Sequence, residues 1–98
     1  MRCITDERIY NASTAFAIVE SKKGFMLLFN KYRKKWELTG GYIEPGESPK
    51  ESIIRECKEE SNQNISDVTF VGLAKYTNMN AAIYYTYLDT EELFLQIL

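Results

Sequence analysis

The sequence contains no histidine and two cysteines, Cys3 and Cys57, which stand far apart and form no Cys-x-x-Cys pair. These absences exclude a zinc finger and a small disulfide framework. No apolar run approaches the ~18 residues that a membrane-spanning helix needs. Residues 1–13 carry charges where a secretory signal peptide would need an apolar stretch. We therefore expect a cytoplasmic protein with reduced thiols and no membrane partner.

Neither sign of charge dominates the chain, because 12 Lys and Arg residues face 14 Asp and Glu residues, for a formal net charge of −2. This balance does not favour a protein that holds nucleic acid by bulk electrostatics, so any phosphate binding must be local. The chain has 98 residues, of which 45% are hydrophobic. A chain of this size forms a single domain, residues 1–98, with one core.

Apolar and β-branched segments predict four strands, at residues 13–20, 25–29, 67–76 and 81–88. A Gly-containing turn separates the first two strands, which predicts a β-hairpin. Residues 36–47 hold three of the five glycines and are expected to form a structured loop. Residues 91–98 are expected to begin a further helix.

A helix is predicted from Pro49 to Ser61 or Asn62. Ser48 suits the N-cap, proline suits the first helical position, and Glu51 stands three residues after the cap. Together these residues form a capping box. Asn62 tolerates the left-handed conformation that ends many helices.

Three glutamates, Glu56, Glu59 and Glu60, share one side of this helix through i,i+3 and i,i+4 spacings. An adjoining face is apolar or small, and is formed by Ile53, Ile54, Cys57 and Ser61. Like charges at this spacing cost a few tenths of a kcal/mol per pair, which a bound cation would offset. Oxygen ligands without histidine favour Mg²⁺ or Mn²⁺ over zinc. Taken alone, the triplet favours a solvated acidic face over a metal site.

The spacing of these glutamates with the upstream loop resembles the Nudix box, Gly-x5-Glu-x7-Arg-Glu-U-x-Glu-Glu-x-Gly-U, where U is bulky and aliphatic. Six positions match strictly: Gly41, Glu47, Arg55, Glu56, Glu59 and Glu60. A chance match in a chain of this composition is on the order of 10⁻⁵. Trp36-x-Leu38-x-Gly40-Gly41 also resembles the family's usual Trp-x-Leu-Pro-Gly-Gly approach, and the resemblance covers residues 13–88.

The chain departs from the family pattern at three places. Thr39 replaces the common proline, which is expected to loosen the loop without removing a ligand. Cys57 replaces an aliphatic core residue and is itself a small hydrophobe. Asn62 and Gln63 replace the closing glycine and aliphatic residue, and we expect Ile65 to take the aliphatic residue's place.

The resemblance implies an α+β fold of the α/β/α sandwich type, with a mixed β-sheet and the loop and helix of the Nudix box. The family's domain usually extends well beyond the strand at 81–88, and another helix covers the second sheet face. We therefore expect a C-terminally abbreviated domain. An uncovered apolar sheet face would favour a homodimer. A further acidic ligand from beyond the box would have to be Glu91 or Glu92.

The resemblance also implies a metal site that uses Mg²⁺, with Mn²⁺ as a substitute. Its ligands would be Glu56, Glu59 and Glu60, together with the backbone carbonyl of Gly40. Glu56 or Glu59 would be the general base that activates water. Arg55 would orient these carboxylates.

Two further residues of the box, Gly41 and Glu47, would support the site. Glu47 is equally well explained as a charge near the start of the helix, where the helix dipole favours it. Lys31, Arg33 and Lys35 would contact phosphates, or would form part of a solvated loop.

Nudix enzymes hydrolyse diphosphate linkages in nucleotide derivatives, and a nucleoside triphosphate is the favoured substrate here. ADP-ribose, a sugar nucleotide and the 5′-pyrophosphate of RNA are alternatives. A non-catalytic Nudix-like domain that binds a nucleotide or a protein partner is an alternative of another class. A plain acidic interaction helix explains neither Gly41 nor Glu47 at their register.

Overall fold

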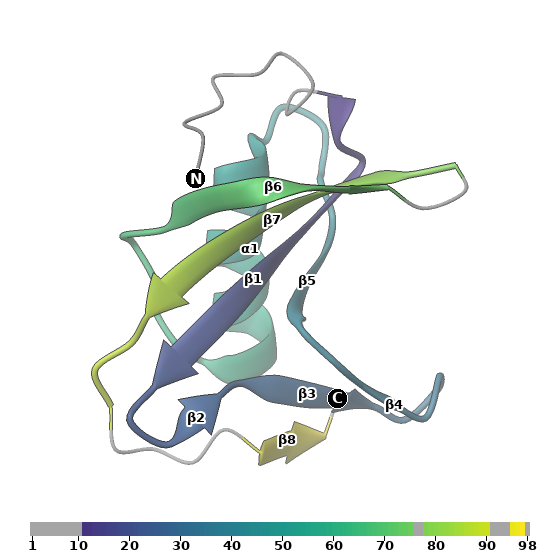
Figure 1. Ribbon diagram of the computed structural model, residues 1–98. Coiled ribbons are helices and arrows are strands. Elements are labelled where there is room, and N and C mark those ends of the chain that lie inside the picture. The colour runs from purple at the N-terminus through teal and green to yellow at the C-terminus, as the bar shows by residue number, and fades with distance from the viewer. Residues whose placement is uncertain (1–10, 76–77, 91–94, 98) are drawn as a thin grey trace.

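The computed structural model describes residues 11–75, 78–90 and 95–97 of the chain. These residues form eight strands and one helix (Figure 1). In chain order they are β1 (Thr14–Ser21), β2 (Gly24–Phe25), β3 (Leu27–Asn30), β4 (Lys35–Glu37), β5 (Thr39–Tyr42), α1 (Pro49–Ser61), β6 (Thr69–Lys75), β7 (Asn80–Tyr87) and β8 (Leu95–Ile97).

The main sheet is mixed and has the strand order β2-β1-β7-β6, with β5 also paired to β1. β1 lies at its centre, parallel to β7 from Thr14↔Ala81 to Glu20↔Tyr87 and antiparallel to β5. A second sheet has the order β4-β3-β8, in which β3 is antiparallel to β4 and parallel to β8. The predicted mixed sheet and α+β class are confirmed.

The predicted hairpin forms, but its second strand is shorter than predicted. β2 pairs with β1 at Glu20↔Phe25, and the N–H of Met26 donates to the carbonyl of Val19 at 2.8 Å. The chain then leaves the main sheet, and β3 joins the second sheet. Exposure alternates over this segment, with Phe25 59% and Met26 1% exposed. One side of the segment is therefore exposed, and the other side lies in the core.

Residues 36–47 were expected to be a loop, and this prediction is wrong over β4 and β5. β5 pairs with β1 through Phe16↔Gly40 and Ala15↔Gly41. A Cβ on Gly40 would lie 2.1 Å from the carbonyl oxygen of Ala15, so glycine here permits close approach of two strands. The glycines had indicated a loop because glycine is common both in loops and where two strands approach closely.

The predicted C-terminal helix is contradicted at residues 95–97, which form β8 and pair with β3. The register is Leu27↔Leu95 to Phe29↔Ile97, so this segment extends a sheet. Glu91 and Glu92 lie outside the described residues, as does Cys3.

The helix prediction is confirmed at both ends. The N–H of Glu51 donates to Ser48 Oγ at 3.1 Å, and the N–H of Ser48 donates to Glu51 Oε1 at 2.9 Å. At the other end Asn62 has a φ of 60°, and its N–H donates to the carbonyl of Lys58 at 3.0 Å. These contacts satisfy backbone groups that every helix end leaves without an intrahelical partner.

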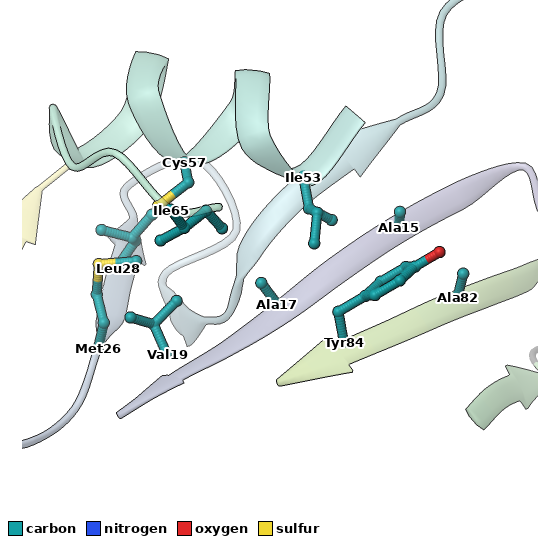
Figure 2. Close-up of a cluster of buried hydrophobic side chains, with 10 residues drawn as sticks. All are labelled: Ala15, Ala17, Val19, Met26, Leu28, Ile53, Cys57, Ile65, Ala82 and Tyr84. Atoms are coloured by element: carbon teal, nitrogen blue, oxygen red, sulfur yellow. The ribbon is translucent and has the colours of Figure 1, made fainter. Parts of the chain in front are cut away.

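The core lies between α1 and the main sheet (Figure 2). Ile53 and Cys57 point from α1 toward β1, where Ala15 and Ala17 are fully buried. Burying a side chain such as Ile53 contributes about 1.5–3 kcal/mol. Ile65, which is 5% exposed, packs in the same cluster, as predicted. This packing fixes the position of the acidic face of α1 relative to the sheet.

The opposite face of the main sheet is apolar and less buried. Strand alternation places Phe16, Ile18, Ile83 and Tyr85 on this face, and all four are half-buried. Tyr87, on the same face, is 50% exposed. In the described residues no helix lies over this face, and no helix has the length and apolar character to cross a membrane.

Candidate active site

Arg55 joins the loop before α1 to the helix. Its Nε donates to Glu47 Oε2 at 2.7 Å and its Nη2 donates to Glu47 Oε1 at 3.0 Å. The N–H of Glu44 also donates to Glu47 Oε1, at 3.0 Å. These hydrogen bonds hold the pKa of Glu47 down to about 2 and raise that of Arg55. Glu47 therefore ties the loop to the helix.

The same guanidinium contacts two glutamates of the acidic face. Its Nη1 donates to Glu56 Oε1 at 2.7 Å and to Glu59 Oε2 at 3.2 Å. Its Nη2 also reaches the carbonyl of Tyr42 at 3.3 Å. A charge-assisted contact of this kind is roughly twice as strong as a neutral hydrogen bond. Arg55 thus opposes the mutual repulsion of Glu56 and Glu59.

Glu56 packs directly against the backbone of Gly41. A Cβ built on Gly41 would lie 3.3 Å from the carboxylate carbon and from Oε2 of Glu56. The Glu56 side chain is 17% exposed, whereas that of Glu59 is 58% exposed. Gly41 therefore provides a cradle in which the Glu56 carboxylate sits against β5.

Glu60 makes different contacts from the other two glutamates. Its Oε1 accepts hydrogen bonds from Thr39 Oγ1 at 2.7 Å and from the N–H of Gly40 at 3.0 Å. Burial raises the pKa of Glu60, against the lowering effect of these two hydrogen bonds. Thr39 is fully buried and lies in β5. The expectation that this residue loosens the loop is therefore wrong.

A cavity of about 620 Å³ opens beside Glu56. Its walls come mainly from β1, β5 and the loop before α1, and are formed by Thr14, Phe16, Arg33, Glu37, Gly40, Gly41, Tyr42, Glu44, Glu56 and Met79. Arg33 donates to both carboxylate oxygens of Glu37, at 2.9 and 3.1 Å. Lys31 and Lys35, predicted with Arg33 to contact phosphate, are not part of this lining.

The predicted site residues are thus only partly gathered at one place. Gly40, Gly41 and Glu56 line the cavity. Arg55 links Glu59 to Glu56, and Glu60 is hydrogen-bonded to β5. Among the described residues, no three Asp, Glu, Cys or His side chains form a ready metal cluster. The donors are nevertheless all oxygens, and the Gly41 cradle holds one carboxylate at an open cavity, so the residues fit a hard divalent cation.

Several lining residues were missed in the sequence. Phe16 and Tyr42 bring aromatic rings to the cavity, and Met79 brings a thioether. The signal for Phe16 was available, because alternation along β1 places it on the face opposite Ala15 and Ala17. Met79 comes from the segment before β7 and required the tertiary structure.

The sequence matches the NUDIX domain family over residues 10–97. A hydrolase of the NUDIX family from Clostridium perfringens is 24% identical, with a TM-score of 0.70 over 81% of this chain and 68% of that protein. The Bacillus subtilis pyrophosphohydrolase BsRppH is 23% identical, with a TM-score of 0.68 over 85% of this chain and 53% of that protein. An Ap4A hydrolase from C. elegans is 23% identical, with a TM-score of 0.69 over 82% of this chain and 68% of that protein.

The chain spans as little as about half the length of these solved structures, and at such identities the likeness shows a shared fold. No curated protein gives a significant match. The fold and the spacing of Gly41, Glu47 and the helix residues define a Nudix domain. The chain belongs to the Nudix family.

Proposed function

We propose that this protein is a metal-dependent Nudix hydrolase that cleaves the diphosphate linkage of a nucleotide derivative, with a nucleoside triphosphate favoured. The observation that carries the proposal is the Glu56 carboxylate, which Arg55 and Gly41 hold at the wall of a cavity of about 620 Å³. That volume lies within the range of small-molecule sites. Two solved relatives, a pyrophosphohydrolase and an Ap4A hydrolase, support the same class of reaction.

Mg²⁺, with Mn²⁺ as a substitute, would be held by Glu56, Glu59, Glu60 and the backbone carbonyl of Gly40. When bound, the cation would neutralise phosphate oxygens and lower the pKa of a coordinated water. Glu56 is our first choice for the general base, because it is the glutamate that lines the cavity. It would accept the proton of the water whose oxygen attacks phosphorus, while the bond to the bridging oxygen breaks.

The remaining lining suits the nucleoside part of the substrate. Phe16, Tyr42 and Met79 offer aromatic and apolar surface, on which a base can stack. Arg33 is the predicted phosphate contact that lines the cavity, where it is paired with Glu37. We therefore place the base toward the aromatic residues and the phosphates toward Glu56.

The test is a panel of nucleoside triphosphates, ADP-ribose, a sugar nucleotide and RNA with a 5′-pyrophosphate, assayed with Mg²⁺ and product identification. Glu56→Gln and Glu59→Gln should each lower turnover by about 10²–10⁴-fold, as expected for loss of a general base or ligand. Asp67→Asn is the matched control, because Asp67 is exposed and lies outside the site. Full activity in both glutamine variants would show that hydrolysis does not use this site.

The alternative of a non-catalytic domain predicts a different outcome of the same panel. A nucleotide would bind to the wild-type protein, as measured by calorimetry, without metal-dependent release of phosphate or pyrophosphate. Product formation by the purified wild type, lost in Glu56→Gln and retained in Asp67→Asn, would exclude that alternative.

A further inference from the structure

Thr39 is a buried polar residue of β5, and its hydroxyl contacts a glutamate of the acidic face of α1. Its backbone pairs with Ala17 of β1, and its side chain is fully shielded from solvent. Oγ1 donates to Glu60 Oε1 at 2.7 Å, since an ionised carboxylate can only accept. A buried hydroxyl without a partner would be costly, so this contact fixes both side chains.

The next residue along β5 contacts the same oxygen. The N–H of Gly40 donates to Glu60 Oε1 at 3.0 Å. Both groups donate to Oε1, so β5 determines the direction in which the Glu60 carboxylate points. The carbonyl of this same Gly40 is a proposed metal ligand. Two proposed ligands from distant parts of the chain are thereby held in a fixed relation.

We propose that Thr39 is a positioning residue of the metal site, whose hydroxyl holds the Glu60 carboxylate in register with the Gly40 carbonyl. The inference rests on the proposed function, because it assigns Glu60 and Gly40 as ligands. Because both groups of β5 donate to Oε1, Oε2 of Glu60 would be the oxygen that contacts the cation. Residues that orient a ligand in this way typically contribute 10–100-fold to metal affinity.

Two substitutions separate this role from a purely structural one. Thr39→Val keeps the shape of the side chain and removes the hydroxyl. Thr39→Ser keeps the hydroxyl and removes a methyl group from a fully buried position. A role in packing alone predicts that metal affinity follows side-chain volume, and so falls at least as much in Thr39→Ser as in Thr39→Val. A positioning role predicts that metal affinity follows the hydroxyl, so that affinity falls in Thr39→Val and is retained in Thr39→Ser.

The experiment is a titration of the full chain with Mn²⁺ alone, followed by electron paramagnetic resonance, together with melting curves recorded without metal. We expect Thr39→Val to bind Mn²⁺ about 10–100-fold more weakly than wild type, and Thr39→Ser to bind within about threefold of it. The melting curves establish that each variant is folded at the temperature of the titration. If Thr39→Val does not fold, Thr39→Ala replaces it as the variant without a hydroxyl.

Equal Mn²⁺ affinity in wild type and in the variant without a hydroxyl would overturn the proposal while leaving the metal site intact. Affinity that falls as much in Thr39→Ser as in Thr39→Val would also overturn it, because the loss would then follow side-chain volume. A wild-type protein that binds no Mn²⁺ would overturn the metal site itself, and with it the proposed function. The first two results are thus distinguishable from the third.

Discussion

Gly40→Ala would place a Cβ 2.1 Å from the carbonyl oxygen of Ala15 and 2.7 Å from Cα of Phe16. Packed carbon atoms approach to about 3.5–4.0 Å, so β5 would have to move by about 1 Å from its partner strand. The φ of Gly40 is +145°, which L side chains rarely adopt. Backbone strain and overpacking together cost roughly 2–6 kcal/mol. For a domain of this size, that loss lowers Tm by about 10–40 °C.

The neighbouring substitution, Gly41→Ala, is expected to behave differently. Its Cβ would meet the Glu56 carboxylate at 3.3 Å, and this carboxylate is the end of a flexible side chain. A shift of a few tenths of an ångström relieves the contact, so stability should change by at most about 1 kcal/mol. The Glu56 carboxylate moves, however, and misplacement by 1 Å can cost about 10²-fold in rate. We expect turnover to fall by roughly tenfold.

The assay pairs melting curves with initial rates on the best substrate of the panel, for wild type and both alanine variants. The expected result is a large loss of Tm in Gly40→Ala and a loss of rate without a comparable loss of Tm in Gly41→Ala. A Gly40→Ala protein that melts within about 3 °C of wild type would refute the close approach of β5 to β1. A Gly41→Ala protein with full activity would refute the Glu56 cradle.

Two further predictions concern metal and pH. Mg²⁺ at a hundredfold excess over its Kd should stabilise the fold by about 2.7 kcal/mol, and EDTA should reverse this. A Glu59→Gln/Glu60→Gln variant should melt at the same temperature with and without Mg²⁺. If the wild type also melts at the same temperature in both conditions, the metal site is contradicted. Because folding lowers the pKa of Glu47 from 4.5 to about 2, the stabilisation by its pair with Arg55 is complete above about pH 5 and is lost as pH falls toward 2. Urea unfolding across this range should therefore show a shallower acid loss in Glu47→Gln than in wild type, and parallel curves would refute the assignment.

The helix could be predicted from the sequence because its signals are local. Ser48, Glu51 and Asn62 act on backbone groups within one turn of the helix, so their neighbours in sequence are also their partners in space. The spacing that placed Arg55 near Glu56 and Glu59 is likewise a property of one helix. These parts of the molecule needed no knowledge of the tertiary structure.

The strands around the site could not be predicted in the same way. β5 is a strand because β1 lies beside it, and nothing within Thr39–Tyr42 reveals that partner. The segment 25–29 contains no Gly or Pro to mark the point at which Met26 leaves the main sheet. The contact of Thr39 with Glu60 depends on the distance between β5 and α1, which only the packed core determines.

The parallel pairing of β1 with β7 and of β3 with β8 has a consequence for how the protein folds. Each pair joins segments that lie far apart in the sequence, and such contacts slow folding, because a long loop must close before they form. During synthesis, α1 and β5, which carries Gly40, are made well before β7. Each sheet can therefore be completed only after its late-synthesised strand, β7 or β8, has been made. We expect the site to be assembled in a late, cooperative step, after the helix and the hairpins have begun to form.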